Sequence, residues 1–359
     1  GVAFFLKEKK VLFTRWPLQI EIYQDPCCFS FLTEKWSQLL RESASSTICS
    51  TWQWQSIWWN QFGHGKELLV LAFYHGEKLI GLVPLFIQEV DGIKKMEFLG
   101  DASICDHMDV IAARGFEEEV YAATIDFLNK SQKEWEIVDF NGLPDTSCTY
   151  RAFPFLAEAS GYLVTLKVED TSPFIQLPSS WEEYLGSLSQ KNRHELRRKM
   201  NKAEREGAIT LYEVADPSSL DEAMEIFFRL HKKSNHMKSL FMINPMESFF
   251  QAVARAFLKE GWLRLFFLRF NSEPIAALYC FDYKNGMYVY NSGYDPQYAH
   301  ISPGIVLFAH CVRTSIEEGK EVFSFLRGNE TYKYRFGAED SMIYRLIIEN
   351  VRKSRNGNG

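Results

Sequence analysis

The sequence predicts a mixed α+β protein of two tandem domains, each with a mainly antiparallel sheet flanked by helices. Three observations support this. The chain has 359 residues, and one domain takes about 150. Apolar residues make up 46% and charged residues 24%, which is typical of a globular protein. One order of elements, namely helix, antiparallel meander, helix and strand, occurs twice along the chain.

In the first half, short apolar runs alternate with turn residues. Gly and Asp between β-branched and aromatic runs are hairpin signals, as at Val90-Asp91-Gly92. The predicted elements are, in order, helix Trp52–Phe62, strands Leu68–Tyr74, Leu79–Ile87 and Lys95–Leu99, helix Phe116–Lys130 and strand Trp135–Phe140.

The second half repeats this pattern with different residues. Turns at Asn271-Ser272-Glu273 and Lys284-Asn285-Gly286 separate its apolar runs. The predicted elements are helix Pro245–Lys259, strands Trp262–Phe270, Pro274–Phe281 and Met287–Ser292, helix Pro303–Glu318 and strand Val322–Leu326.

The turn-rich stretch around Asp170-Thr171-Ser172-Pro173 marks the domain boundary, near residues 167–178. We therefore expect an N-terminal domain over residues 16–170 and a C-terminal domain over residues 175–350. Residues 351–359, which end in Ser-Arg-Asn-Gly-Asn-Gly, are expected to form a disordered tail.

Charge and composition exclude several classes of protein. The balance of 40 basic against 46 acidic residues gives a net charge of −6, which disfavours a dedicated DNA-binding protein. The apolar runs are shorter than the roughly 18 residues that a membrane-spanning helix needs. The apolar patch at residues 3–6 precedes its lysines, which is the reverse of a signal peptide. Seven cysteines without a CxxC pair indicate reduced thiols and a cytoplasmic location.

The start of the predicted helix Pro303–Glu318 is a candidate anion site. Ser302 suits the N-cap, Pro303 suits the first helical position, and Gly304 leaves the first turn open to a ligand. Unpaired backbone amides and the positive end of the helix dipole favour a pyrophosphate there, with Ile305 next in the turn. An ordinary capped helix is the alternative interpretation.

A polar and aromatic segment follows the last predicted strand of the repeat. Glu330, Tyr332, Lys333 and Arg335 lie within two turns of the strand end, and such a group can supply a base, a proton donor and phosphate contacts. The basic run Ser189–Gly207 is either a solvated helix face or a wall that attracts an anionic ligand.

A compact group at Asp106, His107 and Asp109 could contact the acceptor. Its spacing matches no strong metal signature, so we expect no metal. His231 and Asp295 are further candidates for binding the acceptor.

Several of these segments, in this order, resemble the BioF2-like branch of the GNAT superfamily, which includes CelD-like proteins and is related to the FemAB enzymes. The matching segments are Trp181-Glu-Glu-Tyr-Leu, Leu188-Ser-Gln-Lys-Asn-Arg, Leu230-His231, Ser302-Pro303-Gly304 and Phe325-Leu-Arg-Gly-Asn-Glu-Thr-Tyr-Lys-Tyr-Arg-Phe-Gly337. The resemblance covers residues 175–340 well and the first half more loosely. It implies two GNAT-like folds in tandem, with acyl-CoA held by the second and a first copy that is degenerate. The short Ser-Pro-Gly start departs from the longer glycine-rich loop of ordinary GNAT enzymes.

The expected activity is that of an N-acyltransferase, which moves an acyl group from acyl-CoA to an amine in polysaccharide, cell-envelope or lipid biosynthesis. Glu330 is the expected base, and Tyr294 or Tyr332 the expected acid. Ser302, Pro303, Gly304, Ile305, Lys333 and Arg335 are expected to bind the donor. The acceptor is a small molecule, sugar or lipid amine, and peripheral contact with a membrane is compatible with the sequence. The alternatives are a FemAB-like transferase that uses aminoacyl-tRNA and a non-catalytic binding protein.

Overall fold

The computed structural model describes residues 10–13, 18–101 and 103–351. They form two compact units, one that ends at Asp170 but also contains the chain from Met342 onward, and one over Thr171–Ser341. The apolar patch at residues 3–6 and the tail at residues 352–359 lie outside the described residues. No helix within the described ranges has both the length and the apolar character needed to cross a membrane.

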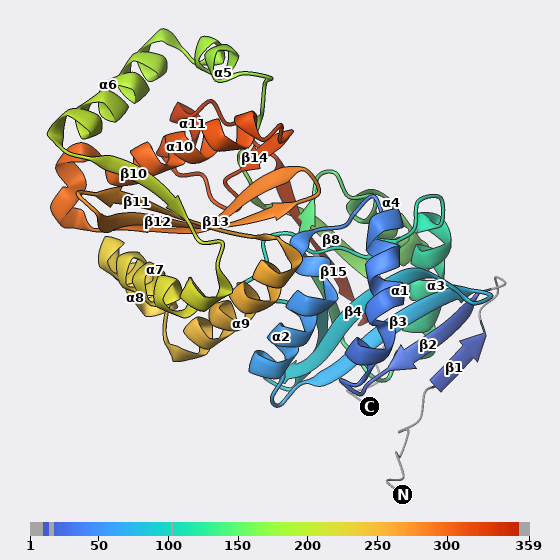
Figure 1. Ribbon diagram of the computed structural model, residues 1–359. Helices are drawn as coiled ribbons and strands as arrows, with labels where there is room; N and C mark the ends of the chain where they lie inside the picture. Colours follow the sequence, from blue (N-terminus) through green and yellow to red (C-terminus); the bar gives the residue numbers. More distant parts are fainter. Residues whose placement is uncertain (1–9, 14–17, 102, 352–359) are drawn as a thin grey trace, which may run out of the picture. The chain divides into compact units, whose positions relative to one another are not determined.

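The first unit is a nine-stranded sheet with four α-helices (Figure 1). Its strands follow the order β1-β2-β3-β4-β5-β7-β15-β8, and β6 pairs with β4. The elements are β1 (Lys10–Phe13), β2 (Gln19–Tyr23), α1 (Cys28–Glu42), the 3-10 helix η1 (Ile48–Ser50), α2 (Trp52–Phe62), β3 (Glu67–His75), β4 (Lys78–Val90), β5 (Ile93–Phe98), β6 (Ile111–Ala112), α3 (Glu117–Lys130), β7 (Ile137–Pro144), α4 (Thr149–Ala159), β8 (Leu163–Thr171) and β15 (Met342–Glu349).

The second unit is a six-stranded sheet with helices on both faces. Its strand order is β10-β11-β12-β13-β14-β9. The elements are β9 (Phe174–Gln176), α5 (Trp181–Ser187), α6 (Gln190–Glu206), β10 (Ile209–Glu213), η2 (Pro217–Ser219), α7 (Leu220–Ser234), α8 (His236–Phe241), α9 (Asn244–Glu260), β11 (Leu263–Phe270), β12 (Glu273–Tyr283), β13 (Gly286–Tyr294), η3 (Pro296–Ile301), α10 (Pro303–Glu317), β14 (Val322–Ser324) and α11 (Thr331–Arg335).

The predicted repeat is confirmed at the level of topology. In each unit an antiparallel meander, β3-β4-β5 or β11-β12-β13, leads into a helix and then into a strand that pairs in parallel with the last strand of the meander. The parallel pairs start at Lys95↔Ile137 in the first unit and at Gly286↔Val322 in the second. The fold is therefore mixed α+β, as the sequence predicts.

The C-terminal strand differs from the sequence prediction. We expected residues 175–350 to form one domain, but β15 pairs with β7 in the sheet of the first unit, from Ile343↔Pro144 to Glu349↔Ile137. β9, the first strand of the second unit, pairs with β14 of the same unit. Apolar side chains of β15 complete the first sheet's core, where Ile343, Leu346 and Ile348 are each 0% exposed.

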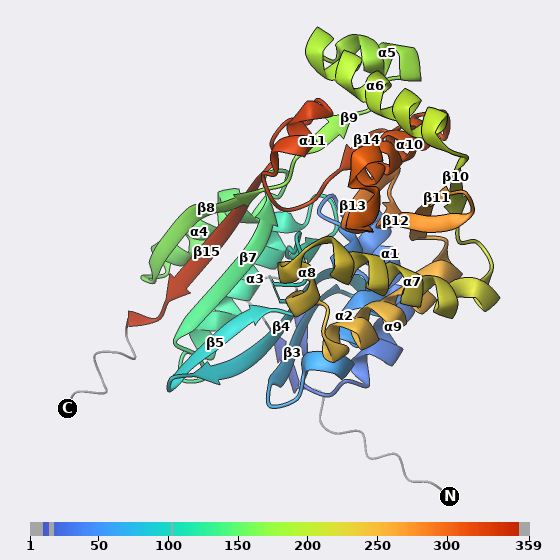
Figure 2. The same ribbon diagram turned by 90° about the vertical axis from the view of Figure 1, so that its left-hand side faces the viewer.

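The core of the second unit fixes the position of α10. Helices α5, α6, α10 and α11 cover one face of the sheet, and α7, α8 and α9 cover the other (Figures 1 and 2). One apolar face of α10 is buried: Phe308, Ala309, Val312 and Ile316 belong to one core cluster with residues of β11, β12 and β13. This packing places the first turn of α10 near the C-terminal end of β13.

Candidate functional site

Two parallel strands of the second unit separate at their carboxyl ends. β13 and β14 are in register only at Gly286↔Val322, Met287↔Phe323 and Tyr288↔Ser324. β13 then continues to Tyr294, while the chain after Ser324 turns away through Leu326 and Gly328, both with positive φ. We call the region beyond Tyr288 and Ser324 the strand split. Beyond this point β14 no longer pairs with β13.

The first turn of α10 is next to the strand split. Pro303 occupies the first turn as predicted, but Ser302 has a left-handed backbone (φ 53°) and its side chain caps no amide. An N-cap side chain needs an extended backbone to reach back to the helix, which explains the difference. Val306 N–H bonds to the Ser302 carbonyl. For the amides of Gly304 and Ile305, the described residues offer no hydrogen-bond partner.

Gly304 keeps the approach to these amides open. A Cβ atom built at Gly304 would have only Tyr294 Cδ1 within 4 Å, at 3.9 Å. Tyr294 is the last residue of β13 and packs against the core beside Ile305. The α10 start, the open glycine and Tyr294 are therefore adjacent, and this arrangement suits an anion with an aromatic side chain beside it.

Glu330 and Lys333 lie at the start of α11, but only Glu330 is accessible. The Glu330 side chain is 58% exposed, and its Oε2 is 2.9 Å from Lys333 Nζ. Lys333 is buried, and its ammonium group also donates to the carbonyls of Leu326, Arg327 and Gly328 at 2.8–3.2 Å. The predicted donor-binding Lys333 therefore uses its hydrogen bonds to hold this loop. Arg335 is exposed on α11, and the described residues provide no partner for it.

Tyr332 is the second tyrosine near the split. Its ring packs against Phe308 of α10 and Phe325, with centroids 5.3 and 6.2 Å away. Burial, with a smaller contribution from the charge of Glu330, raises the pKa of Tyr332 well above the usual value. Tyr332 therefore holds its proton more tightly than an exposed tyrosine, which makes it a weaker acid.

A lysine that the sequence did not single out also reaches the split. Lys238 of α8 donates from Nζ to the carbonyl oxygen of Ser292 on β13, at 2.5 Å, and to Ser292 Oγ, at 3.2 Å. Burial lowers the pKa of Lys238 to about 8, although the nearby charge of Glu330 opposes the shift.

His231 lies behind this lysine and is 1% exposed. Its Nε2 is 3.0 Å from Asn291 Oδ1, and Nδ1 has no partner among the described residues. Burial, and then the charge of Lys238, lower the pKa of His231 to about 4, so the imidazole is neutral at pH 7. The predicted acceptor-binding His231 is therefore enclosed between α7 and β13.

Asp295, another predicted acceptor contact, is occupied within the fold. Its Oδ1 accepts from the amide of Gln297 at the start of η3, and its Oδ2 is 2.8 Å from Lys233 Nζ. This ion pair lowers the pKa of Asp295. The carboxylate thus joins α7 to the end of β13.

Asp106 and Asp109 lie in the first unit. Asp109 is 3% exposed and accepts from Thr149 Oγ1 at 2.5 Å and from the Val110 amide at 2.8 Å. Burial raises the pKa of Asp109 to about 7, despite these hydrogen bonds. Asp106 is half-buried in the same loop. Among the described residues, these side chains form no cluster suited to a metal.

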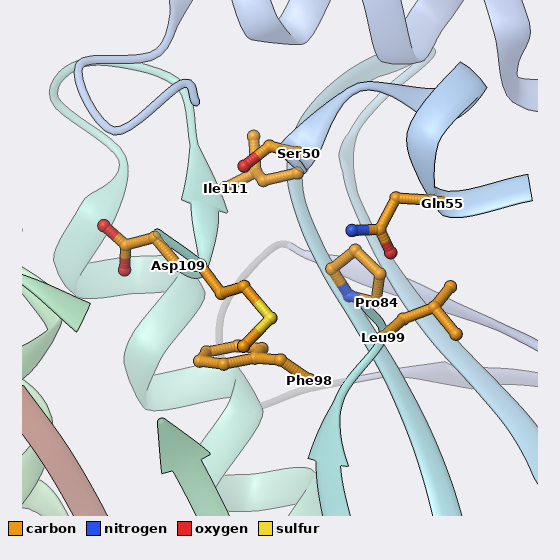
Figure 3. Close-up of a pocket in the computed structure, with 8 residues that line it drawn as sticks. Ser50, Gln55, Pro84, Phe98, Leu99, Asp109 and Ile111 are labelled. Carbon is orange, nitrogen blue, oxygen red and sulfur yellow. The ribbon is translucent and has the colours of Figure 1, made fainter. Parts of the chain in front are cut away.

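The first unit contains two cavities near its own parallel pair, β5 and β7. One holds about 10 Å³, room for about one water molecule, and Figure 3 shows the Asp109 carboxyl group on the opposite side of it from Gln55. The other has about 190 Å³ and is lined by Glu97, Phe98, Asp101, Met108, Asp139, Asn141 and Arg345. Arg345 of β15 forms two hydrogen bonds to Asp139 here, at 2.8 and 2.6 Å.

The sequence of the second unit matches one protein-family model. Residues 190–334 match the family model described as an acetyltransferase (GNAT) domain. No curated protein sequence matches this chain. The domain that the match describes contains the strand split, the start of α10 and Glu330, so the second unit is similar to GNAT acetyltransferases.

Solved structures share the fold at low identity. A crystal structure of FemX is 11% identical, covers 87% of this chain and 95% of its own, and has a TM-score of 0.60. A structure of the protein named L-PGS from Bacillus licheniformis is 15% identical, covers 87% of this chain and 90% of its own, and has a TM-score of 0.55. The C-terminal domain of a putative lysylphosphatidylglycerol synthetase from Agrobacterium fabrum is 10% identical, covers 89% and 92%, and also has a TM-score of 0.55. At these identities the likeness concerns the fold alone.

Proposed function

We propose that this protein is an N-acyltransferase that uses acyl-CoA as the donor and an amine as the acceptor, in the BioF2-like and CelD-like branch of the GNAT superfamily. The observation that carries the proposal is the strand split of the second unit, with the open amides of Gly304 and Ile305 at one side and Glu330 at the other. The match of residues 190–334 to the acetyltransferase domain supports the reaction class.

In this proposal the donor pyrophosphate lies at the first turn of α10. Two free amides and the positive end of the helix dipole attract its charge, and the first turn contains no acidic side chain. Arg335 provides a further positive charge, while Lys333 stabilises the loop. The acyl thioester extends along the open edge of β13, where backbone amides can polarise its carbonyl group.

The first unit has no equivalent donor site in this proposal. Its helix α3 begins with Glu117, Glu118 and Glu119, and the Gly115 amide already donates to Glu117 Oε2 at 2.7 Å. Three carboxylates at a helix start repel a pyrophosphate. We therefore assign the donor to the second unit alone.

The chemistry needs a base and an acid. An amine with a pKa near 10.4 must lose a proton before it attacks the thioester carbon. Glu330 can take that proton directly or through a water molecule, because its side chain is exposed. The new C–N bond forms, the C–S bond breaks, and the thiolate of coenzyme A then requires a proton, for which Tyr294 and Tyr332 are the candidates from the sequence.

For the acceptor we propose an amine of the cell envelope, from a polysaccharide, a sugar or a lipid. The similarity in fold to a protein named as a putative lysylphosphatidylglycerol synthetase supports a role of this kind. The exposed Lys191 and Arg197 on α6 would also suit an anionic partner such as a tRNA. An aminoacyl-tRNA is therefore the alternative donor.

Isothermal titration calorimetry with acetyl-, hexanoyl- and palmitoyl-CoA tests the proposal. We expect at least one of them to bind the wild type, and we expect Gly304→Val to weaken that binding at least tenfold, because its side chain covers the α10 amides. The site has room for this side chain, so the thermal stability of Gly304→Val should stay close to that of the wild type.

Gly186→Val, on α5 and with nothing within 4 Å of the added Cβ, is the control for substitution of a helical glycine. Its donor affinity should equal that of the wild type. A folded wild type that binds none of the three donors, but binds an aminoacyl-tRNA, would replace the proposal with the tRNA-dependent reaction.

A further inference from the structure

The strand split contains a cation whose hydrogen bonds leave one proton available. Lys238 has three N–H bonds, and two of them are directed to the carbonyl oxygen and the hydroxyl of Ser292. Ser292 lies on the part of β13 that has separated from β14. The third N–H is not used by the described residues, so it can be transferred without loss of the lysine's position.

The elements around Lys238 hold it firmly. Asn235 caps α8 through the amide of Met237, at 2.8 Å. At Gly293 of β13, helix α7 approaches so closely that an added Cβ atom would lie 2.5 Å from His231 Cα. Helix α8 begins two residues after α7 ends and packs against it, so the position of α7 defines that of α8. A proton donor requires such a defined position.

The charged and titratable groups that face Lys238 are Glu330, at the start of α11, and His231, on α7. His231 is neutral at pH 7, so Glu330 is the negative charge that acts on Lys238. The acid and the carboxylate that receives the amine proton would then be neighbours across the split.

We propose that Lys238 is the general acid that protonates the thiolate of coenzyme A as it leaves. This inference rests on the proposed acyltransferase function. The acceptor attacks as the neutral amine, after its ammonium proton has passed through Glu330 to solvent. As the amine nitrogen bonds to the carbonyl carbon, a second proton moves from that nitrogen to Glu330. As the C–S bond breaks, a proton moves from Lys238 Nζ to sulfur. Glu330 then returns its proton to Lys238, so the products are an amide and free coenzyme A.

Acidity favours this lysine over Tyr332. A thiol has a pKa near 8.5, and a general acid is most effective when its pKa lies close to the working pH. Lys238, at about 8, meets this condition. Tyr332 does not, because burial raises its pKa. The burial that disfavours charge on Lys238 also favours the neutral amine that remains after the transfer.

Two variants separate proton donation from charge. Lys238→Gln can still donate to Ser292 but has no acidic proton. Lys238→Arg keeps the positive charge, but its guanidinium group does not deprotonate in proteins. We expect both to lower kcat by about 10²–10⁴-fold.

The assay is thiol release from the acyl-CoA that binds best, with hydroxylamine as the amine probe. Donor affinity by calorimetry should change less than twofold. Lys259→Gln, an exposed lysine on α9, is the control and should match the wild type.

The outcomes are distinct. If Lys238→Arg keeps wild-type turnover, the charge and not the proton matters, and the proposal is wrong. The wild type alone gives a second test, which does not depend on the folding of a variant. Its kcat should fall above pH 8, because Lys238 loses its proton there. A kcat that stays constant from pH 7 to pH 9.5 would also overturn the proposal. A wild type that binds acyl-CoA but releases no thiol would refute the proposed function and this inference together.

Discussion

Individual side chains near the strand split divide into two groups. Lys333 and Asp295 have their charges satisfied inside the fold, by loop carbonyls and by Lys233 respectively. Arg335 and Gly304 remain open to a ligand, and Glu330 is exposed although it forms an ion pair with Lys333. A buried charge that is not paired destabilises the protein, whereas water solvates an exposed charge, which can then bind a substrate. This division explains why residues close together in the sequence have different roles.

Glu330→Gln should separate binding from chemistry. The amide keeps the size of the side chain but cannot take a proton, so we expect kcat to fall about 10²–10⁴-fold with donor affinity unchanged. Stability should fall as well, because Glu330 Oε2 lies 2.9 Å from the buried ammonium group of Lys333 and the variant removes that ion pair. Turnover from the acyl-CoA assay and calorimetry measure the two effects. Full turnover by Glu330→Gln would show that another group is the base.

Asp109 gives a prediction about pH. Its pKa is about 7 in the fold and near 3.9 in an unfolded chain. The folded state therefore binds the proton more tightly, and the contribution to stability that is present below pH 4 is lost as the pH rises to about 7. Asp109→Asn has no such titration. We expect its free energy of unfolding, relative to wild type, to rise by up to roughly 1.4 kcal/mol per pH unit across this interval.

Urea unfolding at pH 4.5, 5.5, 6.5 and 8 measures this difference. A constant difference between Asp109→Asn and wild type at all four values would mean that Asp109 is ionised in the folded protein. Asp126→Asn, on α3, is a comparison carboxylate in the same unit.

At the scale of elements, the contact between α7 and β13 determines where Lys238 and His231 lie. Gly293 permits it, since a Cβ there would be 2.5 Å from backbone atoms of both His231 and Leu230. Backbone atoms of a packed helix cannot move as a flexible side chain can, so an added methyl group must displace α7.

We therefore expect Gly293→Ala to lower the free energy of unfolding by about 1–3 kcal/mol. Gly186→Ala, within α5, should instead raise it by up to about 1 kcal/mol, because alanine favours the helix and the site is open. Chemical denaturation compares the two. Equal stabilities for Gly293→Ala and wild type would mean that α7 is not held at this distance from β13.

At the scale of the whole molecule, the chain returns to the first unit after it has formed the second. β15 follows the second unit in sequence but lies between β7 and β8 in the sheet of the first. All six strands of the second sheet lie within residues 171–341, whereas the first sheet needs residues beyond 341.

A fragment of residues 171–341 should fold alone and bind acyl-CoA with nearly the affinity of the full chain. A chain cut after Ser341 should keep that binding but lose hydrogen-exchange protection in β7, which depends on β15 for one of its two neighbouring strands. Calorimetry and hydrogen exchange by mass spectrometry measure these effects. Unchanged protection of β7 in the cut chain would contradict the pairing with β15.

The sequence by itself determined the mixed α+β class, the two meanders and the start of α10, because hairpin turns and helix signals depend on neighbours in the chain. It also indicated that Gly304 leaves the first turn of this helix open. Only the tertiary structure decided that Lys333 is buried under its own loop and that Lys238 reaches Ser292, 54 residues away. It also decided that β15 joins the first sheet. These features depend on contacts between distant segments, and no local pattern in the sequence encodes which distant backbone a side chain or an edge strand will meet.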